Sequence, residues 1–333
     1  MNRQLFQHDE FFGYRFIPGL KARVEHEGGG YLVRVNQAGF RCDHEVLPEK
    51  RPGRFRVLLF GDSYTAGDGV SNPHRYGDQL EKLLPGLEVY NFGLPGSGTD
   101  QQYLIYRQLA EGLEHDLVLI GVLVENIRRV VARFRPYQTS EGHPLILAKP
   151  YFSLGRDDEL TLHHVPVPKE PLPVETLPPA DRSHVDQGGR LPWLREFVNH
   201  VGPRAKDWAQ RLTRYQPLPA YERSDDPAWR LMRGILRRWI SETKTRVIVC
   251  PIPLYQHVEG TASPRAYQAR FAELADPPRV VVHDPLPDLL RRSREERRNF
   301  RFGVDCHLTR TGHRALAESL VRSLLPMLEE ARH

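Results

Sequence analysis

Residues 55–66 read Phe-Arg-Val-Leu-Leu-Phe-Gly-Asp-Ser-Tyr-Thr-Ala, an apolar run that passes directly into Gly61, Asp62 and Ser63. The run predicts a buried strand over residues 56–60 that ends at a tight turn. A strand holds the side chain that follows it in place, and backbone N–H groups of the next turn point at whatever that side chain attacks. Ser63 is therefore a candidate nucleophile, and a simple helix cap made by Asp62 and Ser63 is the alternative.

The rest of the chain repeats this strand pattern. Apolar runs at 88–92 and 116–123 predict two more strands, separated by helical patterns. After residue 225 come a helix capped by Asp226, strands at 246–250 and 279–283, and a last helix at 311–325. Alternating strands and helices are typical of a parallel sheet with crossover helices. The sequence therefore predicts an α/β fold, a three-layer α/β/α sandwich with a parallel sheet.

Polar residues follow three of these strands. Ser63 follows the first, Gly96 lies in the loop after the second, and Asn126 follows the third. Parallel sheets bind ligands at the carboxyl ends of their strands. Near the C-terminus, His307 is a candidate base for Ser63, and Asp305 a candidate to orient the imidazole. His283 and His313 are weaker alternatives for the base.

Three donors are candidates for an oxyanion hole: the backbone N–H groups of Ser63 and Gly96 and the side-chain amide of Asn126. Fixed donors of this kind stabilise the negative charge that develops during acyl transfer. Gly93 and Gly98 remain alternatives to Gly96, and a plain turn residue is the alternative interpretation of Asn126.

These blocks resemble the SGNH hydrolases, also called the GDSL esterase/lipase superfamily, over residues 54–133 and 245–327. Ser63 matches the first block, Gly96 the second, Asn126 the third, and Asp305 with His307 the last. The resemblance implies a flavodoxin-like fold and a serine hydrolase without cofactor. Two features depart from the family pattern: Asp305 and His307 are two residues apart where many members have three, and the residue after Asn126 is not the usual aspartate.

The chain divides into a main domain with two additions. Residues 1–53 are expected to form a lead that packs on the main domain, and 54–330 to form the hydrolase domain. Eight prolines between residues 144 and 179 interrupt the region 134–225. We expect this region to be an insertion, a possible cap over the site, with a hairpin within 151–167 and a helix at 191–212.

Composition limits the class of protein. The 333 residues are 40% hydrophobic and 27% charged, with net charge +5, which is a soluble globular profile. No apolar run approaches the ~20 residues that span a bilayer, and the N-terminus lacks the apolar segment of a signal peptide, so we expect a cytoplasmic protein without a membrane span. The three cysteines predict neither a disulfide framework nor a metal site. The basic stretch at 291–298 indicates a solvated helix face rather than a nucleic-acid site.

The expected function is that of a serine esterase acting on a small-molecule or glycan ester through an acyl-enzyme on Ser63. An O-acetyl group on a sugar or natural product is one substrate that the family analogy offers. The alternatives are an O-acyltransferase with the same three residues and a non-catalytic binding module on the same fold. Arg128 or Arg129 could recognise an acidic group on a substrate, although a solvated surface position is the simpler interpretation. The oligomeric state, the acyl group and the alcohol stay open.

Overall fold

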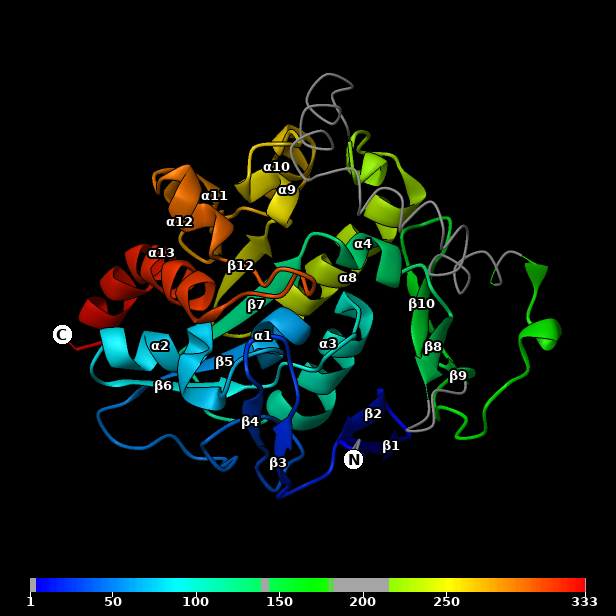
Figure 1. The fold of residues 1–333 in the computed structure, drawn as a ribbon. Coiled ribbons are helices and arrows are strands. Elements are labelled where there is room, and N and C mark those ends of the chain that lie inside the picture. Colours follow the sequence, from blue (N-terminus) through cyan, green and yellow to red (C-terminus); the bar gives the residue numbers. More distant parts are fainter. Residues whose placement is uncertain (1–3, 139–143, 180, 182–215, 333) are drawn as a thin grey trace.

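A computed structural model describes residues 4–138, 144–179, 181 and 216–332 (Figure 1). Five parallel strands form the central sheet in the order β13-β12-β7-β5-β6. They are β5 (Phe55–Gly61), β6 (Leu87–Asn91), β7 (Leu117–Leu123), β12 (Arg246–Ile252) and β13 (Val280–Val282). The strand order reverses between β5 and β7, and ligands bind at such switch points. The predicted α/β sandwich with a parallel sheet is confirmed.

Helices cover both faces of the sheet. On one face lie α2 (Tyr76–Leu83) and α13 (Arg310–Glu330), and on the other α3 (Thr99–Ile105), its continuation η2 (Tyr106–Ala110) and α8 (Pro227–Glu242). Successive side chains of a strand point to opposite faces. The Phe60 ring accordingly lies 5.1 Å from that of Trp239 on α8, while Leu59 contacts α2 at Gly77.

Shorter helices fill the connections. These are α1 (Ser63–Ala66), η1 (Asn72–His74), α4 (Asn126–Arg129), η3 (Val174–Thr176), η5 (Pro219–Tyr221), α9 (Tyr255–Val258), α10 (Arg265–Ala272), α11 (Leu286–Leu290) and α12 (Arg294–Arg298). Two of them, α1 and α4, begin directly after β5 and β7 and therefore lie at the carboxyl edge of the sheet.

Two helix boundaries test the sequence prediction. Asp226 caps α8 as expected, because its Oδ1 accepts the N–H of Ala228 at 2.9 Å. The last helix was predicted to end near residue 325, but α13 continues to Glu330 and contains Pro326. Proline removes one helical hydrogen bond, but Met327 and Leu328 beyond it are buried, and this apolar burial favours continuing the helix.

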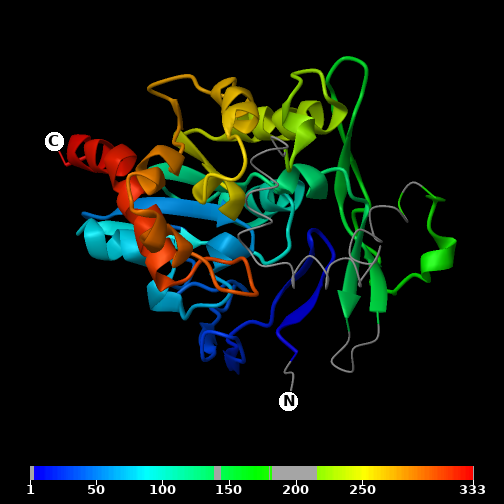
Figure 2. The same ribbon diagram turned by 45° about the horizontal axis from the view of Figure 1, so that its top comes forward.

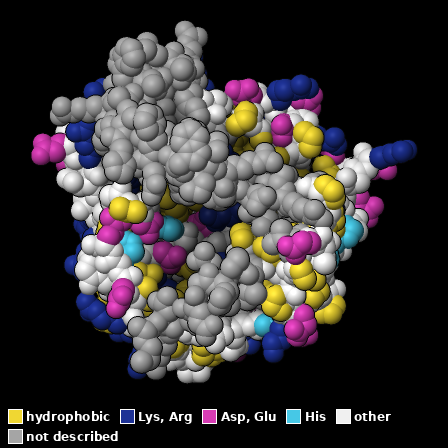
Figure 3. Space-filling view, turned by 45° about the vertical axis from the view of Figure 1, so that its right-hand side comes forward, with side chains coloured by type: hydrophobic (Ala, Val, Ile, Leu, Met, Phe, Trp, Pro, Cys, Tyr) yellow, Lys and Arg dark blue, Asp and Glu magenta, His cyan; other side chains and the backbone are white. Residues whose placement is uncertain are grey.

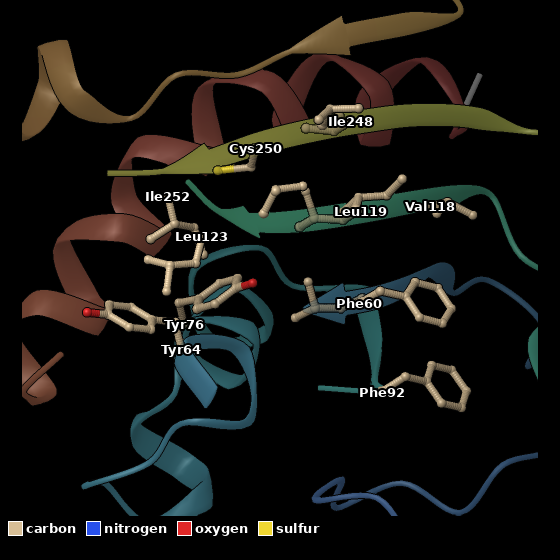
Figure 4. Close-up of a cluster of buried hydrophobic side chains, with 14 of the residues drawn as sticks. Phe60, Tyr64, Tyr76, Phe92, Val118, Leu119, Leu123, Ile248, Cys250 and Ile252 are labelled. Carbon is tan, nitrogen blue, oxygen red and sulfur yellow. The ribbon is translucent and has the colours of Figure 1, made fainter. Parts of the chain in front are cut away.

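The core fixes the strand that carries Ser63. Side chains of β5, β7 and β12, among them Phe60, Leu119 and Ile248, form one buried cluster in Figure 4. Phe60 stacks on Phe92 at 5.1 Å between ring centroids. Replacing a buried phenylalanine by alanine typically costs ~3–5 kcal/mol, so the end of β5 is held firmly.

The N-terminal lead contains two antiparallel hairpins, one of β1 (Phe6–Asp9) with β2 (Gly13–Phe16) and one of β3 (Lys21–Val24) with β4 (Tyr31–Arg34). Within this lead, β4 pairs with β3 and not with the central sheet. Phe12, Phe16 and Phe40 of the lead are buried in the main core. The lead therefore packs on the main domain without extending its sheet.

The described part of the insertion consists mainly of two ribbons (green in Figure 2). One pairs β10 (Tyr151–Leu154) with β11 (Leu160–His163), which confirms the hairpin predicted within 151–167. The other pairs β8 (Phe134–Gln138) with β9 (Pro144–Ala148) and was not predicted. A two-stranded ribbon consists only of edge strands, which tolerate prolines such as Pro136. The helix predicted at 191–212 lies outside the described residues.

Candidate active site

Ser63 is the first residue of α1, immediately after β5. The preceding Asp62 is the N-cap, and its Oδ1 accepts the N–H of Tyr64 at 3.0 Å. The turn requires glycine at position 61, because a Cβ there would lie 2.0 Å from Thr65 Oγ1. The cap and the candidate nucleophile are therefore two different residues of one turn, and the Ser63 hydroxyl is left for another partner.

That partner is His307. Its Nε2 lies 2.8 Å from Ser63 Oγ, and its Nδ1 lies 2.5 Å from Asp305 Oδ1. The backbone N–H of His307 also donates to Asp305 Oδ1 at 3.0 Å. A carboxylate beside Nδ1 places the imidazole proton on Nδ1 and leaves the Nε2 lone pair for the serine hydroxyl. The structure thus brings together three residues that the sequence separates by up to 244 positions.

Burial and hydrogen bonding set the charges of this group. Burial disfavours a charged Asp305, but hydrogen bonds from His307 and His26 outweigh it and hold the pKa of the carboxyl well below its usual range. Burial also disfavours a charged His307, yet the hydrogen bond to Asp305 and the nearby carboxylates of Asp68 and Asp62 raise the pKa of the imidazole. A raised pKa makes His307 a stronger base once it is neutral.

A second histidine, which the sequence analysis missed, contacts the same carboxylate. His26 Nε2 lies 2.9 Å from Asp305 Oδ2, and the Gly28 N–H donates to His26 Nδ1 at 3.2 Å. Because Nδ1 accepts a hydrogen bond, the ring proton is on Nε2 and is donated to Asp305. The contact spans 279 residues, so no local pattern around position 26 could have revealed it.

The neighbouring Glu27 holds the backbone of the Asp305 loop. Its carboxylate accepts the N–H groups of Gly303 at 3.1 Å, Val304 at 3.0 Å and Asp305 at 2.5 Å. The N–H groups of Asp305 and Val304 lower the pKa of Glu27. Since the Val304 side chain is 94% exposed, burial of apolar surface contributes little to the stability of this loop. Glu27 therefore supplies a restraint on Asp305 that the loop itself lacks.

The candidate oxyanion donors differ in how closely they border the pocket. Gly96 lines the cavity beside Ser63 and has φ +76°, a conformation that favours glycine. Of the two alternatives, Gly98 already donates its N–H to Gln101 Oε1, and Gly93 packs against the backbone of Ala66. These contacts favour Gly96 over its neighbours.

Asn126, at the start of α4, is fully buried. Its amide nitrogen and oxygen have no hydrogen-bond partner within the described part of the chain. A buried polar group without a partner costs about 1–3 kcal/mol, so this amide is available for a bound group. Its neighbour Glu125 lines the pocket, whereas Asn126 is not among the lining residues.

The cavity around Ser63 has a volume of about 390 Å³. Apolar residues from the lead line one side, among them Leu5, Phe6 and Phe16. Figure 3 shows basic side chains deep in a hollow of this surface, with acidic and histidine side chains beside them. The cavity is large enough for a small acyl or aryl ester and combines an apolar wall with charged groups.

The other residues singled out from the sequence have structural roles or lie beside the pocket. His313 is fully buried, accepts the Tyr76 N–H at 3.2 Å, and burial lowers its pKa to about 3. His283 bonds the hydroxyls of two serines of α13, Ser319 and Ser323. Neither histidine contacts Ser63, so both alternatives for the base lose support.

The two arginines behave differently. Arg128 donates to Glu125 and to a backbone carbonyl at 2.7 Å, and it does not line the pocket. Arg129 does line it, and its Nη1 lies 2.7 Å from Asp62 Oδ2. Burial disfavours a charged Arg129, but the attraction to the Asp62 carboxylate outweighs this effect and raises the pKa of the guanidinium. Of the pair, only Arg129 can therefore meet a ligand beside Ser63.

Two features are absent from the part of the chain that the structure describes. None of its helices has the length and apolar character needed to cross a membrane. It also contains no group of three or more histidine, cysteine or acidic side chains placed to hold a metal ion.

No model of a known protein family matches the sequence. No curated protein matches it either.

Solved structures do match the fold, and they include lipolytic proteins and esterases. A member of the lipolytic G-D-S-L family from Veillonella parvula is 12% identical, with a TM-score of 0.40, over 80% of this chain and 97% of its own. A lipase from a goat rumen metagenome is 11% identical, with a TM-score of 0.42, over 81% and 97%. A two-domain esterase active on acetylated mannans is 11% identical, with a TM-score of 0.36, over 85% of this chain and 50% of its own.

Proposed function

We propose that this chain is an SGNH-type serine hydrolase that cleaves a carboxylic ester through an acyl-enzyme on Ser63. One observation carries the proposal: Ser63 Oγ, His307 and Asp305 form a continuous hydrogen-bonded chain with separations of 2.8 and 2.5 Å. A base within hydrogen-bond reach of a serine, itself oriented by a carboxylate, is the arrangement that activates a serine hydroxyl.

In the first step, Ser63 Oγ attacks the ester carbonyl while His307 Nε2 takes the hydroxyl proton. The carbonyl oxygen becomes an oxyanion, and Asp305 stabilises the imidazolium that forms. As the tetrahedral intermediate collapses, His307 returns the proton to the departing alkoxide, and the alcohol leaves. The acyl group then remains on Ser63 as an ester.

In the second step, water attacks the acyl-enzyme with His307 again as the base. The second tetrahedral intermediate breaks its bond to Ser63 Oγ, which takes back the proton, and the carboxylic acid is released.

In both steps the N–H groups of Ser63 and Gly96 and the amide of Asn126 would bind the oxyanion. One such donor is typically worth about 3–4 kcal/mol.

An O-acyltransferase is the second candidate, and the apolar side of the pocket supports it. Leu5, Phe6 and Phe16 of the lead line the site with apolar groups, and such a wall disfavours water. An acceptor alcohol would then take the place of water in the second step. Adding an alcohol during turnover separates the two functions, since a transferase accumulates the new ester and a hydrolase accumulates the free acid.

The proposal is tested with an uncharged fluorophosphonate followed by intact-mass measurement. Wild type should gain one adduct, and Ser63→Ala should gain none while remaining folded. A folded wild type that stays unlabelled, and that hydrolyses none of a panel of short-chain esters, would contradict the proposed function and favour a binding module on this fold.

A further inference from the structure

Arg135 differs from the other arginines around the Ser63 pocket. It lies on β8, in the insertion, and lines the same cavity as Ser63. Of the other two lining arginines, Arg129 pairs with Asp62 at 2.7 Å and Arg41 lies 3.9 Å from Asp68. Arg135 forms no ion pair with any carboxylate of residues 4–138, 144–179, 181 and 216–332. Its charge is therefore not neutralised within the described part of the molecule.

The guanidinium of Arg135 is nevertheless held in one place. Its central carbon lies 3.9 Å from the centre of the Tyr14 ring, a favourable cation–π distance. The Tyr14 hydroxyl in turn donates to the carbonyl of Pro95 at 2.5 Å. A Cβ on Gly96 would lie only 2.8 Å from Arg135 Nη2, so the guanidinium sits directly against this peptide. Arg135 is therefore fixed beside a candidate oxyanion donor.

We propose that Arg135 forms an anion subsite in the Ser63 pocket and that the substrate is an ester with a carboxylate or a similar anionic group. This inference rests on the proposed ester hydrolysis and names its substrate class. The planar guanidinium can donate two parallel hydrogen bonds to a carboxylate. Because its position is already fixed, binding costs less conformational entropy than it would for an arginine free in solvent.

The negative groups of the pocket do not cancel this charge. Glu125 lies 3.2 Å from Arg128, which is outside the pocket. Asp68 lies 3.9 Å from Arg41, so another cation of the pocket already faces this carboxylate.

Positive charge also continues beyond Arg135, away from Ser63. Arg135 and Phe6 line a second cavity of about 150 Å³, whose wall also includes Lys149 and Lys169. Lys149 is paired with Asp100, whereas Lys169 is exposed. An anionic group longer than a single carboxylate would therefore meet a further cation, Lys169, along this direction.

The test compares two esters of nearly equal shape, 4-acetoxybenzoate and the uncharged 4-acetoxybenzamide. We take the ratio of their kcat/KM values in wild type, Arg135→Gln and Arg156→Gln. Differences in the intrinsic reactivity of the esters are the same for every enzyme and cancel when the ratios are compared. The Arg156 variant is the matched control, because it removes an exposed arginine of the insertion that lines neither this pocket nor the adjoining cavity.

We expect Arg135→Gln to lower the ratio by about tenfold, the effect of losing a charge-assisted hydrogen bond of ~1.5 kcal/mol. Arg156→Gln should leave the ratio unchanged, and added salt should lower it in wild type but not in Arg135→Gln. A second pair of esters, mono(4-nitrophenyl) glutarate and its terminal amide, is compared in the same way. In this pair the charge lies on the acyl side of the ester. Equal ratios in wild type and Arg135→Gln for both pairs would overturn the subsite.

A binding measurement separates this inference from the proposed function. Calorimetry with 4-hydroxybenzoate and 4-hydroxybenzamide requires no turnover, and glutarate with glutaramate gives the corresponding pair for the acyl side. Weaker binding of either anion to Arg135→Gln than to wild type, with no change for its amide, supports the subsite even if no ester is cleaved. Equal binding to both proteins in both pairs would reject it, even if Ser63 reacts with the fluorophosphonate.

Discussion

The N-terminal lead and the insertion both reach the Ser63 site from outside the α/β core, but they contact different parts of it. The lead contributes His26 and Glu27, which bond the side chain and backbone of Asp305. The insertion contributes Arg135, which lines the cavity beside Ser63. We infer that His26 and Glu27 of the lead control the geometry of the reacting groups, whereas Arg135 of the insertion affects which substrate binds.

Packing explains why each segment suits its role. Phe12, Phe16 and Phe40 of the lead are buried in the same core as the strand that carries Ser63. The lead can therefore hold the loop that carries Asp305, which is distant in the sequence, in a fixed position. The ribbon of β8 and β9 pairs with no strand of the central sheet, and its Arg135 is half-buried. Residues of such a ribbon can be substituted without disturbing the central sheet.

The largest effect should follow from Asp305→Asn, which removes the negative charge that His26 of the lead contacts. An asparagine favours the wrong imidazole tautomer and does not stabilise the imidazolium, so kcat for an uncharged ester should fall by about 10⁴-fold, as in serine proteases. Steady-state kinetics and the rate of fluorophosphonate labelling both measure it. If kcat stayed within tenfold of wild type, the contacts of the lead with Asp305 could not govern catalysis.

A smaller loss is expected for Glu27→Gln. The carboxylate accepts three consecutive backbone N–H groups, and one amide oxygen cannot replace both of its oxygens. A displacement of Asp305 by a fraction of an ångström should lower kcat by about tenfold, with little change in KM. Glu25→Gln is the matched control, an exposed carboxylate on the same segment. Equal kcat values for the two variants would show that the loop needs no such restraint.

His26→Phe should change the pH profile more than the maximal rate. The base must be neutral, so kcat/KM falls as the pH drops through the pKa of His307, which lies above its ordinary value. Without the hydrogen bond from His26, the Asp305 carboxylate stabilises the imidazolium more strongly. The acid limb should therefore move to higher pH, by about half a unit. A merely structural role for His26 would lower kcat and leave this limb in place.

The sequence could predict the sheet and the positions of Ser63 and Asn126 for a physical reason. Strands buried on both faces are continuous apolar runs, and the site of a parallel sheet lies where these runs end. Ser63 and Asn126 both follow such ends directly. Asp305 and His307 were found through their resemblance to a family block, and the structure places them beside Ser63.

The contacts of the two added segments could not be predicted in the same way. The hydrogen bond of His26 with Asp305 joins residues 279 positions apart, and nothing local marks either side chain for it. Arg135 lies in a proline-containing ribbon with no periodic apolar pattern. Its position depends on Tyr14 of the lead, which packs under the guanidinium. Tertiary packing alone determines these contacts.

The smallest effect, and the sharpest contrast with the lead, is expected for Arg135→Gln with an uncharged fluorophosphonate. The probe carries no group for the anion subsite, so its labelling rate should remain within about twofold of wild type, whereas Glu27→Gln should slow it by about tenfold. Time-resolved intact mass measures both rates under identical conditions. If Arg135→Gln slowed labelling as much as Glu27→Gln, Arg135 would act on the reacting atoms through Gly96, and the division between the two segments would be wrong.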